Sequence, residues 1–482
     1  MTTKENLQSD SDRTIPWLLL ADKVPLYFPN TAGILNQNSL STDYSADFGG
    51  TDRFPPRAVL LPRTAADIVT AMRFSQQYRI PVAVRGAGHA ASRLVLRRGG
   101  LIIDMRSLPI ELSINAAAGY IDISGGATWA AVIRATLAQG LMPKTTVDWQ
   151  ELTVAGTIST GGVGAQSFWA GVHADQVMEL ELISGAGEEI CCSPTQDAAV
   201  FEAARAGLGQ AGAMVRVRMP LVAAPLQVRL HELYYTSVGQ LLTDLRVFIR
   251  DRSFDTLLVV AVPRTVAAQR LSERNQRFLH DPAGADATSD WVFKLDAGKY
   301  EFSAPSTVPL ASHQGISETP RGRLLSTEEF LFRAPPLMQR KELYAAPHPE
   351  LILFIPDHAA EELIQATIAA LPVGDMGGGP ILLLPIEFGQ VRAPLLQVPK
   401  ATRGFMFSLL RVAAPATESE VSRLTANNLQ IYARALECGA TRYPCDALPL
   451  APIPAAYWEH RRELQQRLDP AQVLAVPWSL SA

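Results

Sequence analysis

The stretch with the clearest chemical potential is a short glycine loop that ends in a histidine, Gly86-Ala87-Gly88-His89. It follows an apolar run, Pro81 to Val84, that has the β-branched residues of a buried strand. Glycine lets a tight loop bring backbone N–H groups to an anionic oxygen with no Cβ in the way, so this loop suits a phosphate or pyrophosphate. The alternative from these residues alone is a strand-to-loop turn with a structural histidine.

A second segment, residues 152–164, has the composition of a surface that a long ligand could follow. Small and hydroxyl-bearing residues alternate there with apolar ones, from Leu152-Thr153 to Gly164. Hydroxyls and bare backbone could hold such a ligand without any protein charge. A glycine-rich surface loop is the alternative for this segment.

The cysteines and histidines do not have the spacing of a metal site. The four cysteines include an adjacent pair, Cys191-Cys192, and no CxxC motif, and the eight histidines form no HExxH pattern. We therefore expect no metal and no disulfide framework.

The elements that must position these segments alternate between strand and helix. Apolar periodicity predicts one helix starting at Thr64, with Asp67 in its first turn, and another over 128–139 that stops at Gly140. Runs rich in β-branched residues predict strands over 57–62, 81–85, 101–105, 120–124, 178–183, 189–192 and 215–219. This alternation is typical of an α+β or α/β domain of a nucleotide-binding type.

From residue 226 the pattern changes and predicts a second α+β domain. Strands are expected over 228–235, 256–262, 350–355, 381–384 and 404–411, with helices over 241–248 and 419–438. A polar excursion covers 270–290, and the tail has a helix over 458–468 that we expect to return to the first domain. The expected organisation is a lead-in over 1–50, domains over 51–225 and 226–440, and a C-terminal segment over 441–482.

Composition excludes several classes of protein. At 482 residues the chain is too long for one core, and 48% hydrophobic with 19% charged residues describes a soluble globular protein. A net charge of −4 does not indicate the positive surface that binds nucleic acid, so we expect no nucleic-acid partner. The first apolar run, Trp17 to Ala21, is too short for a signal peptide or membrane span, so we expect no membrane partner and a cytoplasmic location.

Taken together, several separated motifs give the chain a family resemblance. The motifs are Pro62 to Val69, Arg85 to His89, Pro143 to Asp148 continuing through Leu152 to Ser159, Gly207 to Gly212, and His348-Pro349 ahead of 351–355. In these motifs the chain resembles the vanillyl-alcohol-oxidase and PCMH-type flavoproteins, and most of all the cytokinin dehydrogenases. The resemblance covers roughly residues 45–475. It implies an α+β fold, with a PCMH-type FAD-binding domain and a substrate domain built on an antiparallel sheet covered by helices.

The resemblance implies FAD with its pyrophosphate over the glycine loop and its 8α-methyl bonded covalently to His89. An N-alkylated histidine withdraws electron density from the flavin and should raise its potential. Relatives with a second, cysteinyl bond have a cysteine near the position of Trp149, so one covalent bond is expected here. The residues implied to line FAD are Val84, Gly86, Ala87, Gly88, His89, Ala90, Asp148, Thr153, Gly156, Ser159, Val163 and Met214.

Asp148 matches the catalytic aspartate of this family, which takes a proton from the substrate amine while the neighbouring carbon gives a hydride to the flavin. A protonated amine has no lone pair to assist hydride departure, so a carboxylate beside the flavin is chemically useful. Burial there would raise the pKa of Asp148 toward the working range. The alternative is a loop aspartate that bonds its own backbone.

Several positions depart from the family pattern. Ala90 stands where the family has serine, Leu94 where it has glutamine, and Ala475 to Trp478 where it has Ser-Pro-Gly-Gln. These changes remove hydrogen bonds to the cofactor and leave its pocket. On the substrate side, Glu350 replaces a tryptophan and Leu258 an acidic residue, so the substrate wall differs from that of cytokinin dehydrogenases. We expect the Glu350 carboxylate either to bind a cationic substrate or to face solvent.

The sequence therefore predicts an FAD-dependent oxidoreductase that removes a hydride from a carbon next to nitrogen in a small amine, with Asp148 as base and Glu350 as a second catalytic candidate. Oxidation of an alcohol or sugar C–O bond is one alternative, and a biosynthetic flavoprotein in which FAD assists cyclisation is another. Dioxygen and a quinone are both open as electron acceptors, and the oligomeric state is not set by the sequence.

Overall fold

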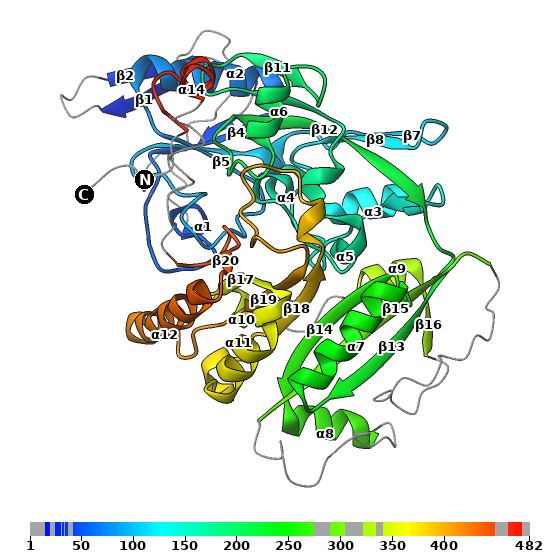
Figure 1. The fold of residues 1–482 in the computed structure, drawn as a ribbon. Helices are drawn as coiled ribbons and strands as arrows, with labels where there is room; N and C mark the ends of the chain where they lie inside the picture. Colours follow the sequence, from blue (N-terminus) through cyan, green and yellow to red (C-terminus); the bar gives the residue numbers. More distant parts are fainter. Residues whose placement is uncertain are drawn as a thin grey trace, which may run out of the picture.

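The computed structural model describes residues 15–19, 25–29, 31–32, 34–36, 42–273, 290–303, 322–333, 341–448 and 461–474 of the chain. Two β-rich parts lie one above the other in Figure 1, the upper one in the colours of the first half of the chain and the lower one mostly green to orange. No helix in the described ranges combines the length and the apolar character needed to cross a bilayer.

A four-stranded sheet holds the glycine loop. In spatial order its strands are β3 (Ile34–Asn36), β4 (Ala58–Leu61), β6 (Leu101–Asp104) and β5 (Val82–Arg85). β4, β6 and β5 run parallel, and α2 (Ala65–Tyr78) connects β4 to β5. Thr64 and Asp67 form a capping box at the start of α2, which confirms the predicted N-cap. The buried strand β5 therefore delivers residues 86–89 at a fixed place.

A six-stranded sheet completes the upper part. Its strands are β7 (Leu112–Asn115), β8 (Tyr120–Ser124), β9 (Leu141–Pro143), β10 (Glu179–Ile183), β11 (Glu189–Cys192) and β12 (Ala213–Ala223). The inner face packs on α3 (Trp129–Leu137), α4 (Val154–Thr160) and α6 (Ala198–Ala204) in one hydrophobic cluster. The predicted hairpin of 178–192 is confirmed by the antiparallel pairing of β10 with β11.

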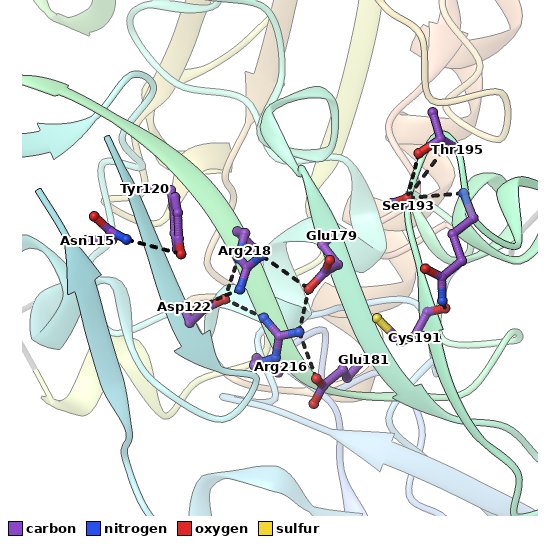
Figure 2. A network of polar contacts seen from close by, with 11 residues as sticks. Asn115, Tyr120, Asp122, Glu179, Glu181, Cys191, Ser193, Thr195, Arg216 and Arg218 are labelled. Atoms are coloured by element: carbon purple, nitrogen blue, oxygen red, sulfur yellow. Dashed lines mark hydrogen bonds and ion pairs between the residues drawn. The ribbon is translucent and has the colours of Figure 1, made fainter. Parts of the chain in front are cut away.

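The outer face of this sheet has a network of charges (Figure 2). Arg216 and Arg218 of β12 lie between Asp122 of β8 and the two glutamates of β10, Glu179 and Glu181. Arg218 Nε is 2.9 Å from Asp122 Oδ1, and Arg216 Nη2 is 2.7 Å from Glu181 Oε1. These ion pairs connect three strands on one face while the alternate residues are buried on the other, so they support the register of the sheet.

The lower part is one antiparallel sheet of eight strands. In spatial order these are β16 (Arg323–Ser326), β13 (Gln227–Tyr235), β15 (Trp291–Glu301), β14 (Thr256–Pro263), β18 (Ile381–Ile386), β19 (Gly404–Leu409), β17 (Leu351–Pro356) and β20 (Thr441–Arg442). One face packs against α7 (Val238–Asp251), α11 (Asp357–Ala369) and α12 (Glu418–Glu437), which are visible in Figure 1. The antiparallel sheet covered by helices agrees with the prediction.

Further elements surround these sheets. They are β1 (Ile15–Leu19), β2 (Pro25–Phe28), α1 (Thr42–Ser45), α5 (Ser167–Ala170), α8 (Arg264–Glu273), α9 (Thr327–Leu331), α10 (Lys341–Tyr344) and α14 (Arg462–Leu468). Around α14 the tail lies against the first part of the chain, because Asp469 Oδ1 accepts a hydrogen bond from Gln76 of α2 and Val473 accepts one from the Val82 backbone. These contacts support the proposal that the tail returns to the first domain.

Sequence and structure differ at several places. The glycine-rich surface loop considered for 152–164 is wrong, because α4 forms there and most of its residues are buried. The strand β15 and the helix α11 were not predicted. The polar excursion at 274–289, the expected helical residues 458–460 and the departure at Ala475 to Trp478 lie outside the described residues.

Candidate active site

A cavity of about 300 Å³ lies where the upper part meets the uncovered face of the eight-stranded sheet. All of the site residues proposed from the sequence line it, namely Val84, Gly86, Ala87, Gly88, His89, Ala90, Asp148, Thr153, Gly156, Ser159, Val163, Met214 and Glu350. They come from five separate segments of the chain. The fold therefore brings together residues that the sequence separates by up to 266 positions, from Val84 to Glu350.

The glycines of the loop have steric reasons to be glycine. A Cβ on Gly86 would lie 2.1 Å from Thr153 Oγ1, so the loop and the start of α4 are in direct contact. Gly88 has φ +76°, and a Cβ there would lie 2.4 Å from the Arg85 guanidinium. The loop thus presents backbone rather than side chains to the cavity. This geometry supports close approach of a ligand to residues 86–88.

Backbone hydrogen bonds to a neighbouring segment fix the start of α4. Val154 and Ala155 donate backbone hydrogen bonds to the carbonyls of Ala127 and Gly125. Gly156 and Ser159 lie on the side of α4 that lines the cavity, whereas Ile158 is fully buried. The small residues of this segment therefore form a smooth wall opposite the eight-stranded sheet.

The imidazole of His89 stands in an aromatic group. Its ring stacks on the Phe48 ring at a centroid distance of 3.9 Å. The Phe48 ring also stacks on the ring of His348, again at 3.9 Å. The Tyr344 hydroxyl lies 3.5 Å from His89 Nδ1. Burial, with a contribution from His348, lowers the pKa of His89 to about 3, so this imidazole is neutral at physiological pH.

Asp148 lies in the turn between β9 and α4 and faces the cavity. Burial raises the pKa of its carboxyl. Two charged neighbours act in opposite directions: Arg333, just after α9, lowers this pKa, and Asp296 of β15 raises it. Asp148 is thus a carboxylate whose proton affinity is set by its surroundings, which is a common property of catalytic acids and bases.

Glu350 lies just before β17 and is 6% exposed, so the solvent-facing alternative is wrong. Its carboxyl lines the cavity, and its Oε1 is 3.8 Å from His348 Nδ1. Burial, with a contribution from the charge of Asp446, raises the pKa of Glu350 to about 8. At neutral pH the side chain is therefore mainly a carboxylic acid, which can donate a hydrogen bond.

The wall opposite the glycine loop is mostly apolar. It is formed by Ile352, Leu382, Leu384, Met406 and Leu410 on β17, β18 and β19 and the residue after β19. Leu258 of β14 is 7% exposed and packs against Leu384. This end of the cavity suits a flat apolar group.

Sequence reasoning missed several lining residues. Phe48, Ser408, Tyr443 and Cys445 face the cavity, and the Tyr443 hydroxyl donates to Thr160 Oγ1 at 3.2 Å while accepting from the Gly162 backbone at 3.0 Å. The alternation of β19 could have indicated Ser408, because Phe405, Phe407 and Leu409 are on the helix-covered face. Tyr443 and Cys445 are brought in by the tail, and no local pattern indicates them.

The residues of the cavity fit a long ligand with an anionic centre and a flat ring system. Gly86 and Gly88 have no side chains, and a Cβ at either would collide with Thr153 or Arg85; hydroxyls line one wall of the cavity and apolar side chains line the other. In the described ranges no group of three or more histidine, cysteine, aspartate or glutamate side chains could hold a metal ion. FAD is compatible with this set of groups.

The chain is similar in sequence to known proteins. The family model described as "FAD binding domain" matches residues 56–193. Cytokinin dehydrogenase 9 of Oryza sativa subsp. japonica is 33% identical over 368 residues, covering 71% of this chain and 69% of the relative. An uncharacterized oxidoreductase, ORF5 of the fasciation locus of Rhodococcoides fascians, is 29% identical over 457 residues, covering 91% and 97%.

A solved structure shares the fold. The crystal structure of 6-hydroxy-D-nicotine oxidase from Arthrobacter nicotinovorans superimposes with a TM-score of 0.68 at 15% sequence identity, covering 92% of this chain and 97% of that one. At this identity the likeness shows the fold alone.

Proposed function

This chain belongs to the PCMH-type FAD-linked oxidoreductases, the family that includes the cytokinin dehydrogenases, and on that premise we propose that it oxidises a small amine at the carbon next to nitrogen. The observation that carries the proposal is the placement of Asp148 in the same cavity as the glycine loop and His89. A base, a cradle for a pyrophosphate and a neutral nucleophile are thereby within one enclosed space.

The residues that would hold FAD are the glycine loop, α4 and Met214, and we propose a covalent bond through His89. FAD, when bound, supplies the chemistry of a hydride acceptor. The protein's part would be to fix the cofactor: the 86–88 backbone would hold the pyrophosphate, with Thr153 and Ser159, which also line the cavity, beside it. Ala90 and Leu94 also line the cavity, where their side chains offer no hydrogen bond.

Asp148 is proposed as the base. Its carboxylate takes the proton from the substrate N–H as the C–H bond next to nitrogen breaks, which leaves an imine. The raised pKa makes this carboxylate a stronger base than an exposed aspartate, and the charge of Arg333 opposes the rise. Enclosure by the apolar wall also excludes water from the reacting atoms.

Glu350 is proposed as the second substrate contact. As a carboxylic acid it donates a hydrogen bond to an acceptor on the substrate, and only above pH about 8 does it offer a full negative charge to a cation. This property favours a substrate that has a neutral nitrogen or oxygen acceptor in addition to the reacting amine.

The experiment that tests the proposal has two steps. Purified protein is precipitated with acid, and the flavin that remains with the polypeptide is measured in the wild type and in His89→Ala. Amines and alcohols are then offered to the enzyme with an artificial electron acceptor. Turnover of amines with covalent flavin agrees with the proposal, whereas turnover of alcohols and of no amine would contradict it.

A further inference from the structure

We propose that Phe48 is a positioning residue, whose ring holds the His89 imidazole face to face in the orientation required for its bond to the flavin. The inference rests on the proposed function, because it concerns FAD bound in the cavity and linked through His89. It assigns a role to the 46–50 segment, which precedes the FAD-binding match at residues 56–193.

The contact geometry is that of a three-ring stack. The His89 and Phe48 rings are 3.9 Å apart at 28°, and the Phe48 and His348 rings are 3.9 Å apart at 15°. Parallel contacts at this distance restrict rotation of a ring about its own side-chain bonds. Because the stack covers one face of His89, its ring edge, where the nitrogens lie, remains for the ligand.

Phe48 can act in this way because its backbone is fixed to both neighbours of the stack. The Phe48 N–H donates to the Ala90 carbonyl at 3.3 Å, directly after His89. The His348 N–H donates to the Gly49 carbonyl at 3.1 Å. Asp47, which is 7% exposed, accepts from the backbone of Gly50 at 2.9 Å and of Arg93 at 2.8 Å.

These hydrogen bonds fix residues 47–50 against the neighbouring segments. A Cβ on Gly49 would lie 2.7 Å from the Ala91 carbonyl oxygen, so these two segments of the chain are in direct contact beside the stack. Displacement of the Phe48 backbone would therefore break hydrogen bonds to two other segments. The ring has a fixed place relative to the glycine loop.

A second group acts on the edge of the imidazole. The Tyr344 hydroxyl, 3.5 Å from Nδ1, is close enough to bias the tautomer of His89, and the Tyr344 carbonyl is 3.3 Å from His348 Nε2. A neutral imidazole keeps one nitrogen lone pair free for bond formation. Phe48 thus fixes the plane of the ring, and Tyr344 biases which nitrogen bears the proton.

Linkage exchanges one C–H bond of the 8α-methyl group for a bond from carbon to the imidazole nitrogen. Two protons leave, one from the methyl group and one from the imidazole or its cation, and two electrons stay on the flavin. Dioxygen, one of the two acceptor classes expected for the enzyme, takes up these electrons together with two protons and is reduced to hydrogen peroxide. Phe48 only orients the imidazole, and it neither gains nor loses atoms or electrons in the linkage.

The experiment compares full-length holoenzymes: wild type, Phe48→Leu, Phe48→Tyr and Phe54→Leu. Phe54 is the matched control, because it lies in the same region of the chain but packs under the guanidinium of Arg98, 4.6 Å away, and does not line the cavity. Total FAD per chain is measured in the native protein, and covalent FAD after acid precipitation and by intact mass. Thermal unfolding shows which variants are folded.

We expect Phe48→Leu to contain FAD but to have a covalent fraction lower by about fivefold or more, while Phe48→Tyr and Phe54→Leu remain close to wild type. Equal covalent fractions in Phe48→Leu and wild type would overturn the inference, as would a Phe48→Tyr variant no better than Phe48→Leu. If Phe48→Leu does not fold, Phe48→Met takes its place under the same criterion. Wild-type flavin that acid releases completely would instead contradict the proposed link itself.

Discussion

Gly86 and Thr153 touch at the edge of the cavity so closely that a Cβ on Gly86 would lie 2.1 Å from Thr153 Oγ1. This contact joins the loop after β5 to the start of α4, the two segments proposed to hold the pyrophosphate and the ring system of FAD. The site thus depends on the separation of two pieces of backbone 67 positions apart in the sequence.

The first prediction concerns this contact. Gly86→Ala should push the loop away from α4, because 2.1 Å is far inside any normal carbon–oxygen contact. We expect FAD per chain to fall by at least about half and the melting temperature to fall by several degrees. Gly374→Ala is the control, since nothing lies within 4 Å of a Cβ at that glycine. Full FAD occupancy in Gly86→Ala would show that the loop does not approach the cofactor closely.

The second prediction concerns the two charges that act on Asp148. Arg333 lowers the pKa of this carboxyl, so Arg333→Met should raise it and move the acidic limb of the kcat/KM profile to higher pH. Asp296 raises the same pKa, so Asp296→Asn should move that limb to lower pH. The measurement is the pH dependence of kcat/KM in both variants. Shifts in the same direction, or no shifts, would exclude Asp148 as the group that titrates.

The third prediction uses the buried acid Glu350. Its pKa in the folded protein is about 8, against an ordinary value of 4.5, so the folded state binds more protons than the unfolded state between these values. Its contribution to stability is therefore fully present below pH about 4.5 and is lost as the pH rises through about 8. We expect Glu350→Gln to gain in melting temperature relative to wild type between pH 5 and pH 8.5.

A matched control for this prediction is Glu361→Gln, an exposed glutamate of α11. Its substitution should leave the pH dependence of the melting temperature unchanged. If Glu350→Gln also leaves it unchanged, then Glu350 is ionised throughout and the hydrogen-bond donor role in substrate recognition is wrong.

Local signals explain which parts of the fold were predictable. Thr64 and Asp67 lie three residues apart and cap α2 as the sequence indicates, and the apolar run before Gly86 is β5. β15 was missed because the face that the helices leave uncovered has Lys294 and Asp296, which form an ion pair at 2.8 Å. A strand with polar residues on one face is difficult to tell from a loop in the sequence until its partner strands are known.

The same distinction applies to the site. The glycine loop, His89 and Asp148 are marked by motifs, so the sequence could place them in one site. The stack of Phe48 between His89 and His348 joins positions 41 and 259 residues apart and depends on backbone bonds that no spacing reveals. Likewise, the burial of Glu350 follows from the fold around it and not from its neighbours in the chain.

The central claim is that Asp148 is the base in oxidation of an amine by FAD bound beside it, and one measurement tests it most directly. An amine that is turned over is mixed anaerobically with wild type, Asp148→Asn and the control Asp251→Asn, an exposed aspartate paired with Arg250, and loss of oxidised-flavin absorbance is followed. We predict reduction at least about 100-fold slower in Asp148→Asn, with unchanged FAD content, and a normal rate in the control. Equal rates in Asp148→Asn and wild type would contradict the claim.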